Sequence, residues 1–368
     1  MDRKTFITPA MSILLDAVRA AAALLVLGGH AVQTKLYIGA YPFDPMTQHY
    51  AVIVFFVLSG LVIAHSVQSR EYSLRKYAIA RVSRIVPVAW FALGFAVVAF
   101  LTIGAFGKSP GFELGQFNHL DPRTFLLPLL FLSETGAGGG PVWNPPYWSL
   151  VYEVWFYAIF CAAVFLTGRI RWLTVVLVCL IAGWRILLMM PIWLMGVALE
   201  KYGDRIPAKG WHAAGLTVTG AACLYAATKL ASPFHDAMYV LFADLGNPLR
   251  WSEYFVTDTV FGLGIAIAFI LLRPLADRNY AALQAVAGPI RCIAGFSFSL
   301  YALHWPMLLV LASFGITAGT SPLAFAALLG GIIGVCALLA QAIELRNRDV
   351  RRWLDRKLVV PGRTPATA

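Results

Sequence analysis

Long apolar runs separated by short polar segments occupy most of this chain. About twenty consecutive apolar residues cross the hydrocarbon core of a bilayer, so runs of this length are expected to be transmembrane helices. The runs lie at 12–34, 48–67, 85–106, 148–167, 172–184, 186–200, 211–229, 256–272, 292–312 and 322–343. The fifth and sixth are short and flank Arg185, which leaves a re-entrant hairpin as the alternative for that pair. The pattern therefore predicts an all-α integral membrane protein, a bundle of about ten transmembrane helices.

Lysine and arginine are distributed unevenly over the segments that connect these runs. With the N-terminus in the cytoplasm, 22 of the 29 basic residues fall in cytoplasmic segments and six on the opposite side, with Arg19 left inside the first run. Cytoplasmic segments of membrane proteins carry the basic excess. We therefore expect both termini of this multi-pass protein to be cytoplasmic.

One transmembrane domain, residues 1–345, is expected to be followed by a basic cytoplasmic tail, residues 346–368. Two connections on the outer side are long, 107–147 and 230–255, and long connections in compact proteins often form lids or binding loops. We expect them to roof an external binding site. The arginine-rich stretch 346–357 is expected to lie as an amphipathic segment on an anionic leaflet.

Composition and charge narrow the class of protein further. Hydrophobic residues make up 60% of the chain and charged residues 13%, with a mean hydropathy of +0.73, too little polar material to coat a soluble globule. The formal charge of +11 does not indicate a nucleic-acid partner, because the basic residues lie between apolar runs. The five cysteines lie inside apolar runs without metal-ligand spacing, so we predict neither a metal site nor a permanently bound cofactor.

Ionisable residues inside the first run are the strongest indication of chemistry. Asp16, Arg19 and His30 lie there, and a charge in hydrocarbon costs several kcal/mol unless it is paired or hydrated. Eleven residues separate Arg19 from His30, so both project from one helical face about 16 Å apart. Asp16 lies three residues before Arg19 and can pair with it. His30 then fits the role of a general base, and Arg19 fits that of a fixed positive charge. The alternative is that Asp16 and Arg19 form only an ion pair and that His30 is a structural histidine.

Glu153 is the one acidic residue of the fourth run, in Pro-Pro-Tyr-Trp-Ser-Leu-Val-Tyr-Glu (145–153). Its expected partner is His30, Arg19 or a substrate hydroxyl, and the alternative is a hydrogen bond between helices. Trp148 in the same segment belongs either to the interfacial aromatic belt or to a platform on which a sugar stacks.

The arginine pair 81/84, Ser59 and His304 each admit two interpretations. Arg81 and Arg84 share one helical face and could bind phosphates bidentately, although the basic bias of cytoplasmic loops also explains such charges. Ser59 is a conceivable nucleophile, but without a local base it is better explained as a packing residue beside Gly60. His304 lies within the ninth run and is either structural or part of a cavity.

Taken together, these segments resemble the acyltransferase 3 family of membrane acyltransferases. The likeness spans most of the chain, and five segments in chain order carry it: Leu-Asp-Ala-Val-Arg-Ala (15–20) with His30, Phe-Phe-Val-Leu-Ser-Gly-Leu (55–61), Arg-Val-Ser-Arg-Ile-Val-Pro (81–87), Trp-Ser-Leu-Val-Tyr-Glu (148–153), and Phe-Ser-Leu-Tyr (298–301) with His304 and Pro306.

The resemblance implies an O-acyltransferase, of the O-acetyltransferase type, that takes cytosolic acyl-CoA, usually acetyl-CoA, as co-substrate. It implies His30 as the catalytic histidine, Arg19 as its essential partner, and Arg81 and Arg84 as the residues that hold the phosphates of the donor. The acceptor is expected to be a hydroxyl of a cell-envelope carbohydrate or related molecule, and the expected location is a bacterial cytoplasmic (inner) membrane.

In the mechanism that we expect, the hydroxyl attacks the thioester directly, with Glu153 orienting the imidazole or the acceptor. The residues expected to line the cavity or bind the acceptor are Asp16, Ser59, Trp148, Tyr301 and His304. The competing interpretation is a secondary transporter or flippase for a sugar or lipid-linked substrate, although no pair of repeated halves is visible. A membrane scaffold is a third interpretation, but it does not explain why the ionisable residues Arg19, His30 and Glu153 lie in lipid.

Overall fold

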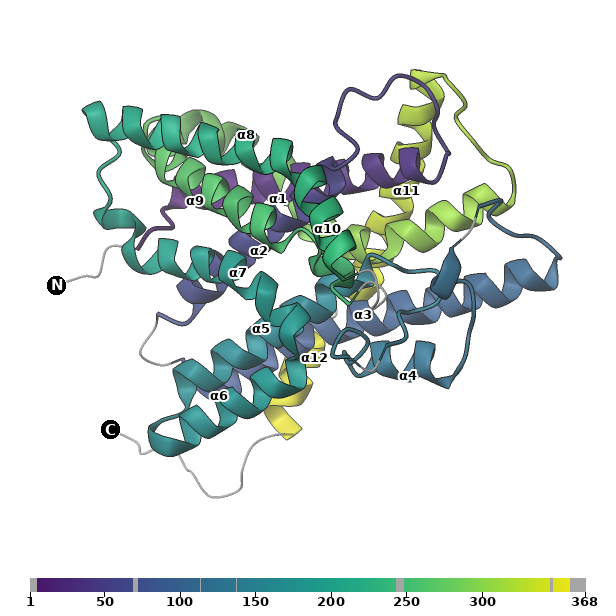
Figure 1. Ribbon diagram of the computed structural model, residues 1–368, viewed down its shortest axis with the longest axis horizontal. Coiled ribbons are helices and arrows are strands. Elements are labelled where there is room, and N and C mark those ends of the chain that lie inside the picture. The colour runs from purple at the N-terminus through teal and green to yellow at the C-terminus, as the bar shows by residue number, and fades with distance from the viewer. Residues whose placement is uncertain are drawn as a thin grey trace.

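A computed structural model describes residues 5–68, 72–112, 114–136, 138–242, 248–344 and 347–357. Within these residues the chain is helical and contains no strand, only an isolated bridge between Tyr37 and Gly319 (Figure 1). The α-helices are α1 (Pro9–Gln33), α2 (Thr47–Ser66), α3 (Leu74–Ala105), α4 (Pro122–Leu129), α5 (Tyr147–Phe165), α6 (Gly168–Ala182), α7 (Trp184–Tyr202), α8 (Gly210–Leu241), α9 (Phe255–Arg278), α10 (Tyr280–Ser313), α11 (Pro322–Ile343) and α12 (Asn347–Lys357). Short 3₁₀ helices are η1 (Gly115–Phe117), η2 (Gly203–Arg205) and η4 (Arg250–Ser252).

Local sequence signals set where several helices begin. The side chain of Thr8 accepts a hydrogen bond from the backbone N–H of Met11 at the start of α1, and Ser73 does the same for α3. Such N-caps satisfy donors that have no partner within the helix. Ser321 caps α11 in the same way, with Pro322 at its first position, where a missing N–H costs nothing.

Within the described ranges, eight helices are long and apolar enough to cross a membrane: α1, α2, α3, α5, α7, α9, α10 and α11. The prediction of an all-helical membrane protein is confirmed. Each of the ten expected apolar runs coincides with a helix, but α6, with 15 residues, and α8 are not among the eight candidates.

Several expectations about helix ends were wrong. Helices α3 and α10 begin 11 and 12 residues before the apolar runs that were expected to start at 85 and 292. The break between the fifth and sixth runs falls at Gly183, before Arg185, because a φ of +80° there suits glycine alone and ends α6. The helix predicted at 211–229 continues to Leu241, since Pro233 lies within α8 without ending it, so 230–241 is helix rather than loop. The remainder of the predicted loop includes residues 243–247, which lie outside the described part of the chain.

The predicted tail is described only at 347–357, where it forms α12, and its remaining positions, 346 and 358–368, lie outside the described residues. Helix α12 packs on α3, and Arg75 of α3 donates a hydrogen bond to the carbonyl oxygen of Asp355 (2.5 Å).

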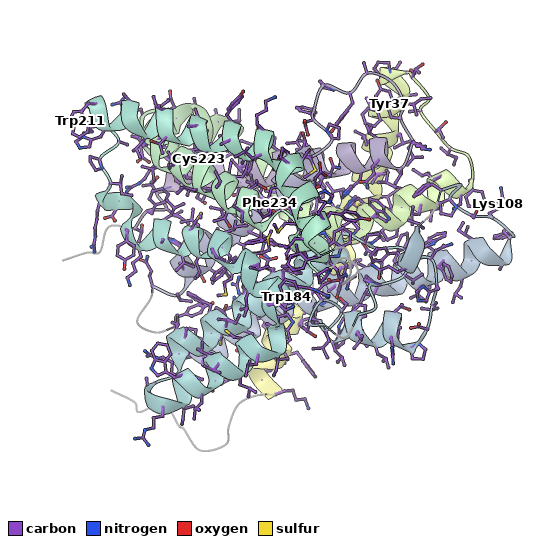
Figure 2. The ribbon with its side chains drawn as sticks, viewed as in Figure 1. Tyr37, Lys108, Trp184, Trp211, Cys223 and Phe234 are labelled. Carbon is purple, nitrogen blue, oxygen red and sulfur yellow. The ribbon has the colours of Figure 1, made fainter. Side chains whose placement is uncertain are left out.

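Close helix pairs form the interior of the bundle. Helix α8 runs along α9, α1 packs against α10, and α2 crosses α7 (Figure 1). The backbones of α2 and α7 lie very close together, because a Cβ atom added at Gly60 or at Gly196 would lie 2.0 Å from a backbone oxygen of the opposite helix. Figure 2 shows Trp184, at the start of α7, near the middle of the molecule, with Trp211 and Lys108 at opposite ends of the view.

Candidate functional site

Two neighbouring cavities gather most of the ionisable side chains that the sequence singled out. The first, of about 90 Å³, is lined by Arg19, Arg81 and Arg84 together with Ser59 and Glu153, and we call it the arginine cavity. The second, of about 540 Å³, has His30 and His49 in its lining, and we call it the histidine cavity. The larger volume lies within the range of about 300–1,000 Å³ that is usual for ligand pockets.

Arginine side chains from α1 and α3 meet in the arginine cavity. Asp16 and Arg19 form the predicted ion pair at 3.2 Å, which partly balances the charge of Arg19. Arg81 and Arg84 approach from α3, and the buried Nε of Arg81 has no hydrogen-bond partner among the residues that the structure describes. Because a guanidinium binds phosphate and carboxylate oxygens with paired N–H groups, this cluster is suited to an anionic ligand.

Glu153 in this cavity is held by hydroxyl groups rather than by an imidazole. Ser59 donates to its Oε1 at 2.5 Å, and Tyr157, one turn further along α5, donates to the same oxygen. Trp193 of α7 in turn donates to the hydroxyl of Ser59 at 3.2 Å. Of the alternatives for Glu153, the hydrogen bond between helices is therefore the one that the structure shows, in a network that joins α2, α5 and α7.

The same network changes the interpretation of Ser59. Close packing at Gly60 is as expected, because the α2–α7 crossing leaves no room for a side chain there. Ser59 itself faces the cavity with a carboxylate as its neighbour, so it is not merely a packing residue. The sequence could not show this, because Glu153 lies on a different helix.

In the histidine cavity, His30 forms one end of a hydrogen-bonded chain. Its Nδ1 lies 2.7 Å from Nε2 of His304, and Nδ1 of His304 lies 2.7 Å from the carbonyl oxygen of Tyr301. The two imidazole rings are parallel, with centroids 5.0 Å apart, and Trp305 meets His30 edge-on at 4.7 Å.

This series of hydrogen bonds determines which nitrogen of His30 carries a proton. A carbonyl oxygen only accepts, so Nδ1 of His304 must donate to Tyr301, and the neutral His304 then offers a lone pair at Nε2. His30 must therefore donate from its own Nδ1, and in its neutral form its Nε2 is unprotonated. His304 consequently holds His30 in the form that can accept a proton from a ligand in the cavity.

Arg19 and His30 do not share one chamber, although both project from α1. Arg19 lines the arginine cavity and His30 the histidine cavity. The two cavities adjoin at Val52 and Tyr301, which line both of them. Tyr301 is fixed in this boundary, since its hydroxyl lies 2.5 Å from that of Ser149 and donates to the carbonyl oxygen of Pro146 at 3.1 Å.

Trp148 is buried rather than part of an interfacial belt. Its exposed fraction is 6%, and its ring stacks on Trp251 with centroids 5.6 Å apart and planes inclined by 9°. Both indoles belong to the lining of the histidine cavity. The interpretation of Trp148 as part of a sugar platform stays a prediction, and the sequence analysis missed Trp251 beside it.

The sequence analysis also missed the pair of His49 on α2 and Asp258 on α9. Nε2 of His49 lies 2.8 Å and 3.0 Å from the two carboxylate oxygens of Asp258. An acidic residue within the apolar run 256–272 was the available signal, because ionisable residues inside spans usually indicate a site.

A buried ion pair anchors the segment between α4 and α5 close to the histidine cavity. Arg250 lies 3.3 Å from Oε2 of Glu134, whose side chain is 1% exposed. Burial raises the pKa of Glu134 to about 7, although the guanidinium groups of Arg250 and Arg185 oppose the shift. The pair connects the segment after α4 to η4, which contains Trp251 and precedes α9.

Comparison with known proteins adds three findings. The sequence profile of a family described as an acyltransferase domain matches residues 13–341. The "Exopolysaccharide production protein ExoZ" of Rhizobium meliloti (strain 1021) is 30% identical over 122 residues, 33% of this chain and 35% of that protein. "Protein 2 in picA locus" of Rhizobium radiobacter is 30% identical over 162 residues, 41% of this chain and 82% of that protein. No solved structure matches the chain.

Proposed function

This chain belongs to the acyltransferase 3 family, and on that premise we propose that it transfers an acyl group, acetyl in the simplest case, from acyl-CoA to a hydroxyl of a carbohydrate. The acyltransferase class follows from the family. The donor, the acetyl group and the roles of individual residues are our proposal.

The observation that carries this proposal is the meeting of two chemically different cavities at one boundary. In the arginine cavity, Arg81 and Arg84 suit the phosphates of CoA, and Arg19 suits the thioester end. Its volume of about 90 Å³ suits the acyl end of the donor rather than the nucleotide. The histidine cavity is larger, neutral to acidic in its lining and contains the unprotonated nitrogen of His30, which suits a hydroxyl-bearing acceptor.

The reaction that we propose is a direct transfer. His30 accepts the proton of the attacking hydroxyl at Nε2, the hydroxyl oxygen bonds to the thioester carbonyl carbon, and the bond from that carbon to sulfur breaks. The proton then passes from His30 to the sulfur, so that CoA leaves as the free thiol. Arg19 provides positive charge on the donor side, where an oxyanion is stabilised by fixed charge without reorganisation.

The membrane orientation of the proposal follows from the location of CoA. Because CoA is a cytosolic co-substrate, we place the arginine cavity on the cytoplasmic side and the histidine cavity on the opposite side. The printed name of one relative concerns exopolysaccharide production, which supports a polysaccharide hydroxyl as acceptor.

The proposal is tested by measuring thiol release from acetyl-CoA and acetylation of envelope polysaccharide in membranes that contain the protein. We expect His30→Ala to reduce both by ~10²–10⁴-fold, the usual contribution of a general base. His65→Ala is the matched control, because His65 lies on α2 outside both cavities and pairs with Glu200 at 3.0 Å. Acetylation at the unmodified rate in the His30 variant would contradict the assignment.

A further inference from the structure

A second imidazole in the histidine cavity is held in a fixed form by a buried carboxylate. His49 lines this cavity from the first turn of α2, and Asp258 lies behind it in the first turn of α9. The side chain of His49 is 16% exposed, whereas that of Asp258 is 1% exposed. Within the described residues, His49 is the only side chain that forms a hydrogen bond with the carboxylate of Asp258, and His49 faces the cavity.

Burial of the Asp258 carboxylate determines which nitrogen of His49 carries a proton. A buried carboxylate is costly unless it accepts hydrogen bonds, so Nε2 of His49 must carry a proton and donate it to Asp258. Nδ1 is then the nitrogen left for a ligand, and across the described residues it has no protein partner. The arrangement resembles the orientation of a catalytic imidazole by a buried aspartate.

The same cavity thus contains two imidazoles that are oriented by different means. His30 is oriented by His304 and a backbone carbonyl, and His49 is oriented by Asp258. One of them serves the reacting hydroxyl in the proposed function. The other is available for a second hydroxyl of the same molecule.

The remaining lining indicates the chemical class of that molecule. The stacked indoles of Trp148 and Trp251 give the cavity an aromatic wall, and Gln33 and Gln48 add neutral polar groups. Among the described lining residues there is no lysine or arginine, and Glu253 is acidic. A sugar with an anionic group would find no lysine or arginine among these residues, whereas a neutral sugar ring matches both the aromatic wall and the neutral polar groups.

We propose that the His49–Asp258 pair is an acceptor-binding subsite, which fixes a second hydroxyl of a neutral sugar while His30 takes the proton from the reacting one. This inference rests on the proposed acyl transfer. It makes His49 a positioning residue, so its loss should weaken binding of the acceptor and leave binding of the donor unchanged.

The test uses the full-length protein in lipid nanodiscs with acetyl-CoA and a panel of acceptors. The panel consists of methyl glucoside, methyl galactoside and methyl mannoside, the monodeoxy analogues of each, and methyl glucuronide as the anionic comparison. We expect His49→Gln to raise the KM for the best methyl glycoside about tenfold, the effect of losing one hydrogen bond, with an unchanged KM for acetyl-CoA. Methyl glucuronide should be the poorest acceptor.

The deoxy analogues make the assignment specific. For one analogue that keeps the reacting hydroxyl, the kcat/KM of the unmodified protein should be about tenfold lower than for the parent glycoside. The kcat/KM of His49→Gln should not fall further with this analogue, because the substitution and the missing hydroxyl remove the same contact. The double variant His49→Leu/Asp258→Leu removes both members of the pair and leaves no unpaired buried carboxylate, so it should behave in the same way even if the single variant folds poorly. The matched control is again a His65 variant, His65→Gln.

Two results would overturn different claims. If His49→Gln and the double variant keep the KM for the glycoside and the full sensitivity to every deoxy analogue, the subsite is wrong while acyl transfer stands. If the unmodified protein releases no CoA thiol with any glycoside, the proposed function fails, and the subsite fails with it.

Discussion

At the scale of single residues, the catalytic proposal depends on hydrogen bonds that determine proton positions. His304 contributes no formal charge to the arrangement. It links the carbonyl oxygen of Tyr301 to His30, and each of the two contacts is 2.7 Å long. A neutral histidine can thus orient a general base where other proteins use a carboxylate.

We expect His304→Leu to lower kcat by ~10–100-fold, the usual cost of losing a group that orients a functional imidazole. Without His304 the ring of His30 can rotate and exchange its protonated nitrogen, whereas the arginine cavity is unchanged. The KM for acetyl-CoA should therefore stay constant while kcat falls, as measured by thiol release. A rise in that KM with an unchanged kcat would point to general distortion rather than to loss of orientation.

A second residue-scale prediction concerns Glu134, whose pKa is raised from 4.5 to about 7 by burial. Its carboxyl group binds a proton more tightly in the folded chain than in the unfolded one. The stability that it contributes is therefore fully present below about pH 4.5 and is lost as the pH rises towards 7, by up to roughly 3 kcal/mol.

Glu134→Gln should remove this dependence, because an amide does not titrate. The difference in thermal unfolding midpoint between Glu134→Gln and the unmodified protein, measured in detergent, should grow in favour of the variant from about pH 5 to pH 7. Asp236→Asn is the control, since the Asp236 side chain is 78% exposed, and it should leave the pH dependence in place. A constant difference across this range would show that Glu134 titrates normally.

At the scale of elements, the crossing of α2 and α7 positions the arginine cavity. Gly60 and Gly196 let the two backbones approach until Trp193 reaches the hydroxyl of Ser59. Small residues at helix crossings serve this purpose in membrane proteins, where close packing replaces the hydrophobic effect between helices. The network around Glu153 thus depends on two glycines that carry no functional group.

Gly196→Ala should destabilise the protein by about 1–3 kcal/mol, because its Cβ would lie 2.0 Å from the carbonyl oxygen of Val57, and a backbone atom cannot move aside cheaply. Gly331→Ala in α11 is the control, since a Cβ there meets nothing within 4 Å, and alanine favours a helix by up to about 1 kcal/mol over glycine. Thermal unfolding in detergent distinguishes the two. Equal midpoints would mean that the crossing is looser than described.

At the scale of the whole molecule, the boundary between the two cavities controls the proposed reaction. Tyr301 and Val52 line both sides of it, so the ring of Tyr301 must be passed or displaced before the acceptor oxygen meets the thioester carbon. Its hydrogen bonds to Ser149 and Pro146 hold the ring in this position. We expect the ring to protect the thioester from water until an acceptor is bound.

Tyr301→Phe should loosen this boundary, because the ring remains while both hydrogen bonds of its hydroxyl are lost. We expect a severalfold rise in hydrolysis of acetyl-CoA relative to transfer, measured as thiol released without acceptor divided by acetylated product. Tyr37→Phe is a suitable control, since the Tyr37 hydroxyl donates to the carbonyl oxygen of Ala40 outside both cavities. An unchanged ratio in Tyr301→Phe would show that the hydroxyl does not hold the boundary.

Several features could be predicted because their causes are local. The apolar runs gave the helices, and the spacing of Asp16 and Arg19 gave their ion pair. The length of α8 was missed because a proline inside a helix does not always end it. The partner of Glu153 was missed because Ser59 lies 94 positions away in the chain.

The sequence by itself determined an all-helical membrane protein and the set of ionisable residues in its spans, because periodicity and hydropathy are properties of each segment alone. Only the tertiary structure decided which of these residues meet. His30 and His304 are 274 positions apart and His49 and Asp258 are 209 apart, yet Arg19 and His30 of one helix line different cavities. The reason is physical: the rotation of each helix is set by packing against helices distant in the chain, and local sequence does not specify it.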